Sequence, residues 1–126
     1  MSREERTGKR DLTFSQWHRS LPDFCTAIDL DFLEYCQQCR EPLALIEIAQ
    51  GHFSIPKPTT VLRMLAVKAN IRAYLVMYEL NKQAPHGLST TMRLQRIFPD
   101  KSDIRTMDVE AVGKLIARLH TAHRCQ

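Results

Sequence analysis

The stretch 43–49 constrains the fold of this chain more than any other segment. It reads Leu-Ala-Leu-Ile-Glu-Ile-Ala, so it is apolar throughout except for Glu47. A strand with one face in solvent alternates apolar and polar residues, whereas a nearly continuous apolar run is typical of a strand covered on both faces. Helices on both sides of one sheet provide such cover, and the stretch therefore predicts an α/β protein.

Helical and strand-like patterns alternate along the rest of the chain. In the first helix, Phe14, Trp17 and Leu21 form one apolar stripe, and we expect Trp17 to pack in the core. The sequence predicts a single three-layer α/β domain over 13–126, with a central mixed sheet of about four strands flanked by helices, after a flexible basic arm over 1–12. The predicted helices are 13–21, 59–70 and a last one that begins at Asp108, and the predicted strands are 27–35, 43–49, 73–80 and 90–98, with a turn at 99–105.

Size and charge exclude several classes of protein. The 126 residues suit one domain, and no apolar run approaches the roughly 18 residues of a membrane helix. The start of the chain lacks the apolar segment of a secretory leader, so we expect a cytoplasmic protein without membrane contact. The formal net charge is +4, and twelve of the 18 cations are arginines, whose shape suits phosphate. Nucleic acid is therefore a candidate partner.

Three carboxylates lie on the first two predicted strands. Asp29 and Asp31 are two residues apart, so they share one face of the first strand. If the two strands pair as a hairpin through the turn 36–42, Asp31 comes opposite Glu47. Facing carboxylates repel each other unless a cation lies between them, and a divalent metal with oxygen ligands meets that requirement. The alternatives are carboxylates in solvent at a sheet edge, or carboxylates paired with arginine.

A family resemblance rests on the segments 28–34 and 45–48. They read Ile-Asp-Leu-Asp-Phe-Leu-Glu and Leu-Ile-Glu-Ile, which resembles the motif strands of the PD-(D/E)xK nuclease superfamily. The resemblance covers about residues 13–80 and implies a restriction endonuclease-like fold, a mixed sheet with flanking helices in the order helix, three strands, helix, strand. It also implies a nuclease that uses Mg²⁺ or Mn²⁺ to cleave phosphodiester bonds in DNA, with a homodimer as one arrangement.

The resemblance assigns roles to the three carboxylates. In the superfamily, the aspartate of the first motif strand and the acid of the second hold the metal, which polarises the scissile phosphate and activates water. Asp29 or Asp31 matches the aspartate: the Ile-Asp-hydrophobic setting favours Asp29, and the hairpin register favours Asp31. Glu47 matches the second acid.

The lysine of the motif is missing. It should follow the acid by two residues, where this chain has Ala49. Lys57, in the loop after the strand, and Lys68, on the next helix, are the candidates to take its catalytic place. If neither does, the chain is a catalytically inactive module that binds nucleic acid or another partner on the same scaffold. Arg19, Lys57 and Arg63 are candidates for contacting phosphate.

The cysteines and the C-terminal histidines suggest a second site. Cys36 and Cys39 form a Cys-x-x-Cys motif in the turn between the two acidic strands, which has the spacing of half a zinc site. His120, His123 and Cys125 have the chemistry to complete a tetrahedral structural Zn²⁺ site. The alternative is free thiols, since disulfides belong to secreted chains. A thioredoxin-like redox role fits poorly, because that motif opens a helix.

Overall fold

A computed structural model describes residues 11–51 and 59–126, so most of the expected arm over 1–12 lies outside the described residues. None of the helices in these two ranges is long and apolar enough to cross a bilayer. In chain order the elements are α1 (Thr13–Arg19), β1 (Phe32–Tyr35), β2 (Pro42–Gln50), α2 (Thr60–Ala69), β3 (Arg72–Tyr78), β4 (Thr91–Phe98), β5 (Arg105–Asp108) and α3 (Val109–Thr121).

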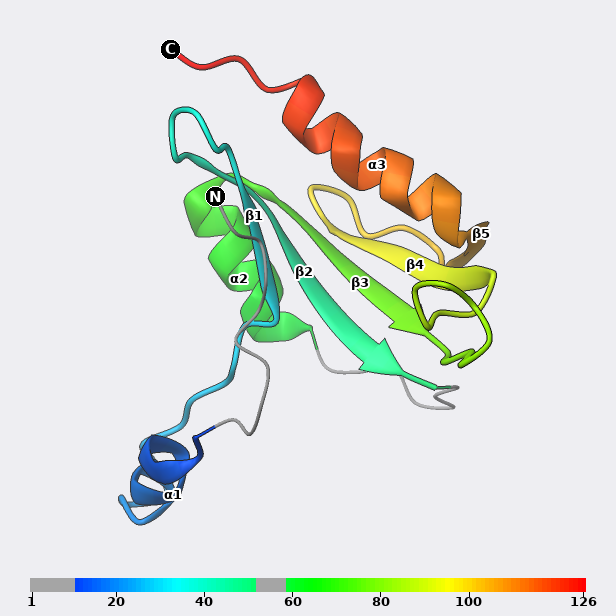
Figure 1. Ribbon diagram of the computed structural model, residues 1–126. Coiled ribbons are helices and arrows are strands. Elements are labelled where there is room, and N and C mark those ends of the chain that lie inside the picture. The colour runs from blue at the N-terminus through cyan, green and yellow to red at the C-terminus, as the bar shows by residue number, and fades with distance from the viewer. Residues whose placement is uncertain (1–10, 52–58) are drawn as a thin grey trace.

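The strands form one open mixed sheet in the order β1-β2-β3-β4-β5. β2 and β3 run parallel and are connected through α2, while the other neighbouring strands are antiparallel. Figure 1 shows the long strands β2 and β3 side by side within the sheet, with β1 and β5 at its edges. The predicted α/β class and the mixed sheet are confirmed, with five strands in place of about four.

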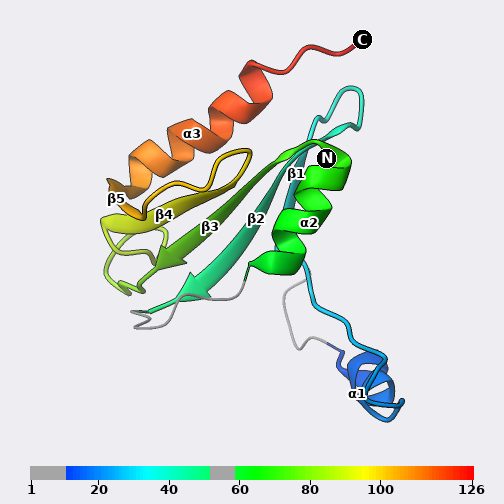
Figure 2. The same ribbon diagram turned by 180° about the vertical axis from the view of Figure 1, so that it is seen from behind.

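Helices cover both faces of this sheet. On one face, Leu62 and Ala66 of α2 pack against a cluster that contains Leu45 and Leu75. On the other face, α3 packs against a second cluster, which contains Ile46. Figures 1 and 2 show α2 and α3 on opposite sides of the sheet. Side chains on both faces of the central strands are therefore buried, which explains why the interiors of β2 and β3 are apolar without alternation apart from Glu47.

From Phe32 to Glu34, β1 pairs with β2 in the register that the sequence predicts, and an irregularity after Glu34 places Tyr35 opposite Pro42. Phe32 lies opposite Ile46, so Asp31, the residue before β1, comes opposite Glu47. β1 nevertheless begins at Phe32, whereas the predicted strand begins at residue 27. The backbone N–H of Ile48 donates to the Asp31 carboxylate over 2.9 Å.

β5 falls in a segment that the sequence predicts as a turn followed by a helix cap. It has one apolar side chain, Met107, and so shows no recognisable strand pattern. It forms a strand because the free edge of β4 offers hydrogen-bonding groups: Met92 lies opposite Met107, and Thr91 lies opposite Asp108. An edge strand needs little apolar content, and the sequence therefore does not reveal it.

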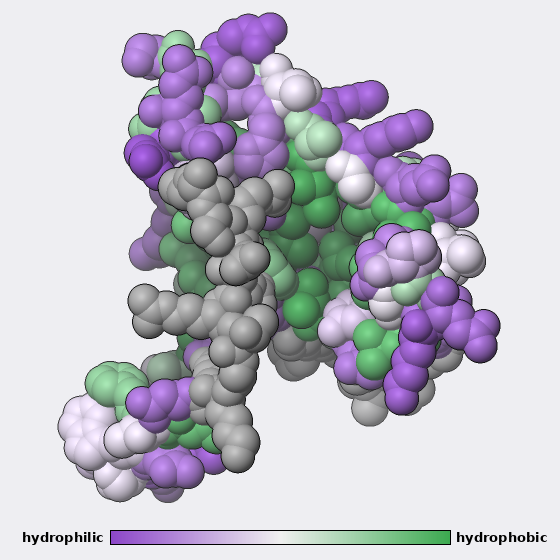
Figure 3. Space-filling model, viewed as in Figure 1, coloured by the Kyte–Doolittle hydropathy of each residue, from purple (hydrophilic) through white to green (hydrophobic). Residues whose placement is uncertain are grey.

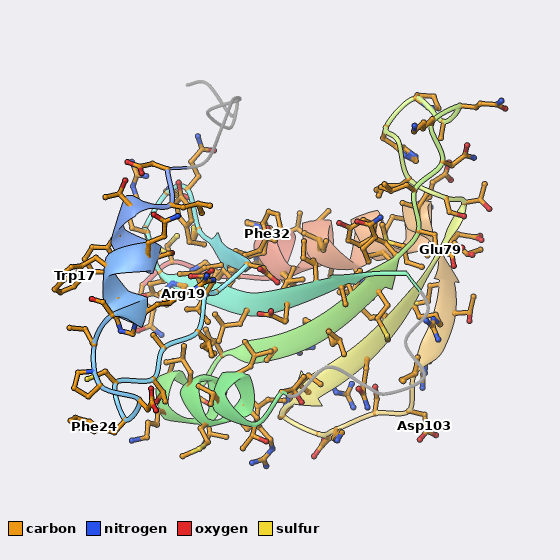
Figure 4. All side chains as sticks on the ribbon, turned by 90° about the horizontal axis from the view of Figure 1, so that it is seen from below. Trp17, Arg19, Phe24, Phe32, Glu79 and Asp103 are labelled. Carbon is orange, nitrogen blue, oxygen red and sulfur yellow. The ribbon has the colours of Figure 1, made fainter. Side chains whose placement is uncertain are left out.

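α1 has no buried residue. The rings of Phe14 and Trp17 contact each other with centroids 5.3 Å apart, and Trp17 is 54% exposed. Figure 1 shows α1 away from the sheet, and Figure 4 shows Trp17 and Phe24 pointing outward. The expectation that Trp17 packs in the core is therefore wrong, because the irregular segment between α1 and β1 carries the helix beyond the sheet.

Candidate metal centres

Glu47 lies in the middle of β2, on the face of the sheet that α2 covers. The residues two before and two after it, Leu45 and Ala49, belong to the core under α2, and Glu47 itself is only 8% exposed. It is the one buried polar or charged side chain in the part of the chain that the structure describes. A carboxylate at this depth is costly unless donors or a cation stabilise it, and such groups concentrate at functional sites.

Asp29, Asp31 and Glu47 line one pocket of about 440 Å³. Its opposite wall is the first turn of α2, which contributes Thr60 and Val61. Asp31 reaches the pocket from the residue before β1 and Glu47 from the neighbouring strand, so the antiparallel pairing of the strands brings them together. The structure thus gathers the three predicted carboxylates at one opening.

Asp31 and Glu47 are the two carboxylates that the strand register places opposite each other. The hydrogen bond from the Ile48 N–H, 2.9 Å long, fixes one Asp31 oxygen beside β2. Asp29, Asp31 and Glu47 do not form a set with ligand atoms all within 4.8 Å of one another. Among the described residues, only a group of cysteines and a histidine has that spacing. Two carboxylates are sufficient for Mg²⁺, which usually keeps several waters and also binds substrate phosphates.

Among the described residues, none of the expected basic side chains lines this pocket. Lys68 is in the last turn of α2 and the pocket touches the first, so roughly 10 Å of helix separates them. Arg63 is exposed on α2, and Arg19 is exposed at the end of α1 (Figure 4). Lys57 lies outside the described residues. Ala49, at the place of the missing lysine, is a core residue that is 7% exposed.

A second group of side chains meets at the tip of the β1–β2 hairpin. The turn carries Cys36 and Cys39, and the segment after α3 brings His123 and Cys125 beside them, as the course of the chain in Figures 1 and 2 shows. One ligand atom from each of these four residues lies within 4.8 Å of all the others. We call them the Cys/His cluster, and they could hold a metal ion.

The distances in the Cys/His cluster fit a tetrahedral ion. The sulfurs of Cys36 and Cys125 are 3.6 Å apart, and the Cys39 sulfur lies 3.2 Å from Nε2 of His123. Around a zinc ion with Zn–S bonds of about 2.3 Å, two sulfurs of a tetrahedron lie roughly 3.8 Å apart. Three thiols and one imidazole are also a common ligand set for structural zinc.

The hairpin turn prepares Cys36 to bind as a thiolate. The turn is closed by the Cys36 N–H, which donates to the Glu41 carbonyl, and by the Arg40 N–H, which donates to the Cys36 carbonyl, each over 2.8 Å. The backbone N–H of Cys39 is the main cause that lowers the pKa of the Cys36 thiol to about 7. Hydrogen bonds with Cys39 and then Cys36 raise the pKa of Cys125 to about 12, because they favour its thiol form. A bound cation would replace these shared protons.

His120, the remaining residue expected at the zinc site, lies outside the Cys/His cluster. Its Nε2 is 2.8 Å from Oε1 of Glu34, so it links the end of α3 to β1. His123 takes the place beside the sulfurs, and its Nε2 also lies 3.7 Å from the Glu41 carboxylate. Sequence spacing could not separate the two histidines. Glu34 could not be identified either, because its role depends on where the end of α3 meets the sheet.

Comparisons with protein-family models, with curated proteins and with solved structures find no match for this chain. Its function must therefore be inferred from the chemistry of the two candidate centres. The carboxylate pocket offers hard oxygen ligands, which suit Mg²⁺ or Mn²⁺, and the Cys/His cluster offers sulfur and imidazole, which suit Zn²⁺.

Proposed function

We propose that the chain is a metal-dependent nuclease that cleaves phosphodiester bonds in DNA. The observation that carries this proposal is the pairing of β1 with β2, which brings Asp31 opposite the buried Glu47 at an open pocket. Such a pair suits Mg²⁺ or Mn²⁺. The same two acids carry the resemblance to the PD-(D/E)xK motif, and the register supports Asp31 over Asp29 as the first metal ligand.

The chemistry follows from the placement of these groups. A divalent ion held there would polarise the scissile phosphate and lower the pKa of the attacking water. Asp31 and Glu47 would hold the ion from two neighbouring strands, and the burial of Glu47 would strengthen its attraction for a cation. Asp29 lines the same pocket and would orient the attacking water or add a ligand oxygen.

The order of elements supports the resemblance from β1 to β3. An antiparallel strand pair is followed by a helix and by a strand parallel to the second of the pair. The restriction endonuclease-like order has the same succession, with one more strand before the pair. In this chain an irregular segment follows α1, and β1 is the first strand of residues 11–51.

A cleavage assay tests the proposal. Purified protein is incubated with single-stranded, duplex and branched DNA in Mg²⁺ or Mn²⁺, and in parallel with EDTA. We expect cleavage only with metal, and a rate about a hundredfold lower in Asp31→Asn and in Glu47→Gln. Asp103→Asn is the matched control, because Asp103 is an exposed carboxylate in the loop between β4 and β5 (Figure 4). Cleavage that persists in EDTA or in Glu47→Gln would contradict the mechanism.

Ala49 favours a second candidate function, a catalytically inactive module that binds nucleic acid. A buried methyl group takes the place of the motif lysine, and no described basic residue lines the pocket. Such a module would bind labelled DNA in a fluorescence anisotropy titration and leave every substrate of the cleavage assay intact. Binding without cleavage therefore selects the second function, and metal-dependent cleavage selects the first.

We propose in addition that the Cys/His cluster holds a structural Zn²⁺. The proposal is supported by the ligand set and by the sulfur–sulfur distance of 3.6 Å between Cys36 and Cys125. A zinc ion there would connect the hairpin turn to the segment after α3. Its role would be structural, because four protein ligands leave no coordination position for substrate.

A further inference from the structure

A cleft of about 630 Å³ lies between α3 and the sheet, on the face opposite the carboxylate pocket. Within residues 11–51 and 59–126, the two cavities share no lining residue. Four different elements each contribute one arginine to the cleft: Arg72 of β3, Arg96 of β4, Arg105 of β5 and Arg118 of α3. None of these arginines forms an ion pair with a carboxylate of the described residues.

Most N–H groups of these arginines remain available to a ligand. Arg96 uses its Nε to donate to the Asp100 carbonyl over 2.8 Å, and Arg72 reaches the Tyr74 hydroxyl with one Nη at 3.4 Å. Glu41 is the one carboxylate among the described residues that line the cleft, and its carboxylate lies 3.7 Å from Nε2 of His123. The cleft therefore has a strong excess of positive charge.

Apolar side chains also line the cleft, and we call this part of the lining the apolar floor. Leu94 and Met107 of the sheet and Leu115 and Leu119 of α3 form it. Figure 3 shows the corresponding pattern on this face of the molecule, with hydrophilic side chains along α3 beside an apolar hollow over the sheet. The volume falls in the range of small-molecule sites, which is about 300–1,000 Å³. A cationic rim above an apolar floor suits a compact ligand that has both an anionic and a flat apolar part.

We propose that this cleft binds a nucleoside polyphosphate. Arginine forms bidentate, charge-assisted hydrogen bonds with phosphate, and several arginines from separate elements match several phosphate groups. The base and sugar would lie on the apolar floor between α3 and the sheet. A binding site of this kind is independent of the proposed nuclease, because the carboxylate pocket lies on the other face.

Isothermal titration calorimetry tests the proposal with the full chain and no added divalent metal, so that the carboxylate pocket makes no contribution. The probes are ATP, GTP, inorganic pyrophosphate and a single-stranded oligodeoxynucleotide. We expect saturable binding of a nucleotide, at least about tenfold tighter than binding of pyrophosphate. Pyrophosphate that binds as tightly as both nucleotides would overturn the role of the apolar floor. An oligonucleotide that binds more tightly than both would overturn the proposal in favour of a nucleic-acid strand.

Matched charge variants identify the site. Arg105→Gln combined with Arg118→Gln removes two exposed arginines of the cleft, and Lys101→Gln combined with Lys114→Gln removes two exposed lysines from the same part of the chain. We expect nucleotide affinity to fall about tenfold or more in the arginine variant and to change less than about twofold in the lysine variant. Equal losses in both variants, or no saturable binding of nucleotide by the parent chain, would overturn the proposal.

Discussion

Glu47 and Ala49 share one face of β2, where the first is a buried carboxylate and the second a buried methyl group. The importance of Glu47 could be predicted from sequence, because an acid inside an apolar strand is costly unless it has a task. The missing lysine was equally visible. The residue that replaces this lysine could not be predicted, because a substitute cation can come from any segment that folds near the pocket. The predicted substitute Lys68 lies at the other end of α2.

Restoring the lysine tests whether the carboxylate pocket lacks only this catalytic group. In Ala49→Lys, an ammonium group would stand on the same face as Glu47, and we expect DNA cleavage to become about tenfold faster or more. The same change should lower the free energy of unfolding by about 1–3 kcal/mol, because Ala49 is a packed core position. Ala49→Met is the control for side-chain length. Equal cleavage rates in the two variants would contradict a catalytic gain from the charge.

The core between α2 and the sheet depends on Leu75. This residue is fully buried in the central strand β3. Leu75→Ala should lower the free energy of unfolding by about 2–5 kcal/mol in a urea titration, because the lost methyl groups leave a cavity. Leu80→Ala is the control, because Leu80 is 57% exposed, and its effect should stay within about 0.5 kcal/mol. Similar losses in the two variants would show that β3 is not the centre of the core.

Among the elements, local sequence patterns predict those features that depend on residues close together in the chain. The β1–β2 register follows from a short turn between two neighbouring strands, and it is confirmed where Phe32 lies opposite Ile46. β5 and the position of α1 depend on distant surfaces, on the free edge of β4 and on the space beyond β1. The choice of His123 over His120 likewise depends on where α3 ends against the hairpin, and the sequence contains no information about that distance.

Removing metal from the Cys/His cluster should release the C-terminal segment from the hairpin. We expect the purified chain to contain about one zinc per molecule, measured by elemental analysis. After chelation, hydrogen exchange should accelerate in residues 36–41 and 122–126 and remain unchanged in β3. Cys39→Ser should lose the zinc, and Cys25→Ser, which changes a cysteine outside the cluster, should keep it. Zinc retained by Cys39→Ser would refute the site.

The exposure of α1 can be measured through Trp17, the one tryptophan of the chain. Because this side chain is 54% exposed, its fluorescence should resemble that of a tryptophan model compound in water and should be readily quenched by acrylamide. Unfolding in urea should then change the emission wavelength little. Blue-shifted emission with protection from acrylamide would show that α1 is packed against another surface.

At the scale of the whole molecule, one sheet separates two chemically different faces. Three carboxylates line the pocket beside α2, and four arginines line the cleft beside α3. The layered architecture could be predicted, because apolar strands require cover on both faces. The separation of carboxylates and arginines onto opposite faces could not be predicted, because a formal net charge of +4 counts residues without assigning them to a face. That assignment depends on strand register and on the path of α3.

The proposed nuclease requires that Asp31 and Glu47 hold a divalent metal between β1 and β2. Anomalous diffraction from a crystal soaked in Mn²⁺ would locate this metal, with the sulfur atoms of the ordered methionines as an internal reference. We expect a manganese peak within about 2.5 Å of a carboxylate oxygen from each residue, and no such peak in Asp31→Asn. A fully soaked crystal with clear sulfur peaks and no manganese between the two carboxylates would contradict the proposal.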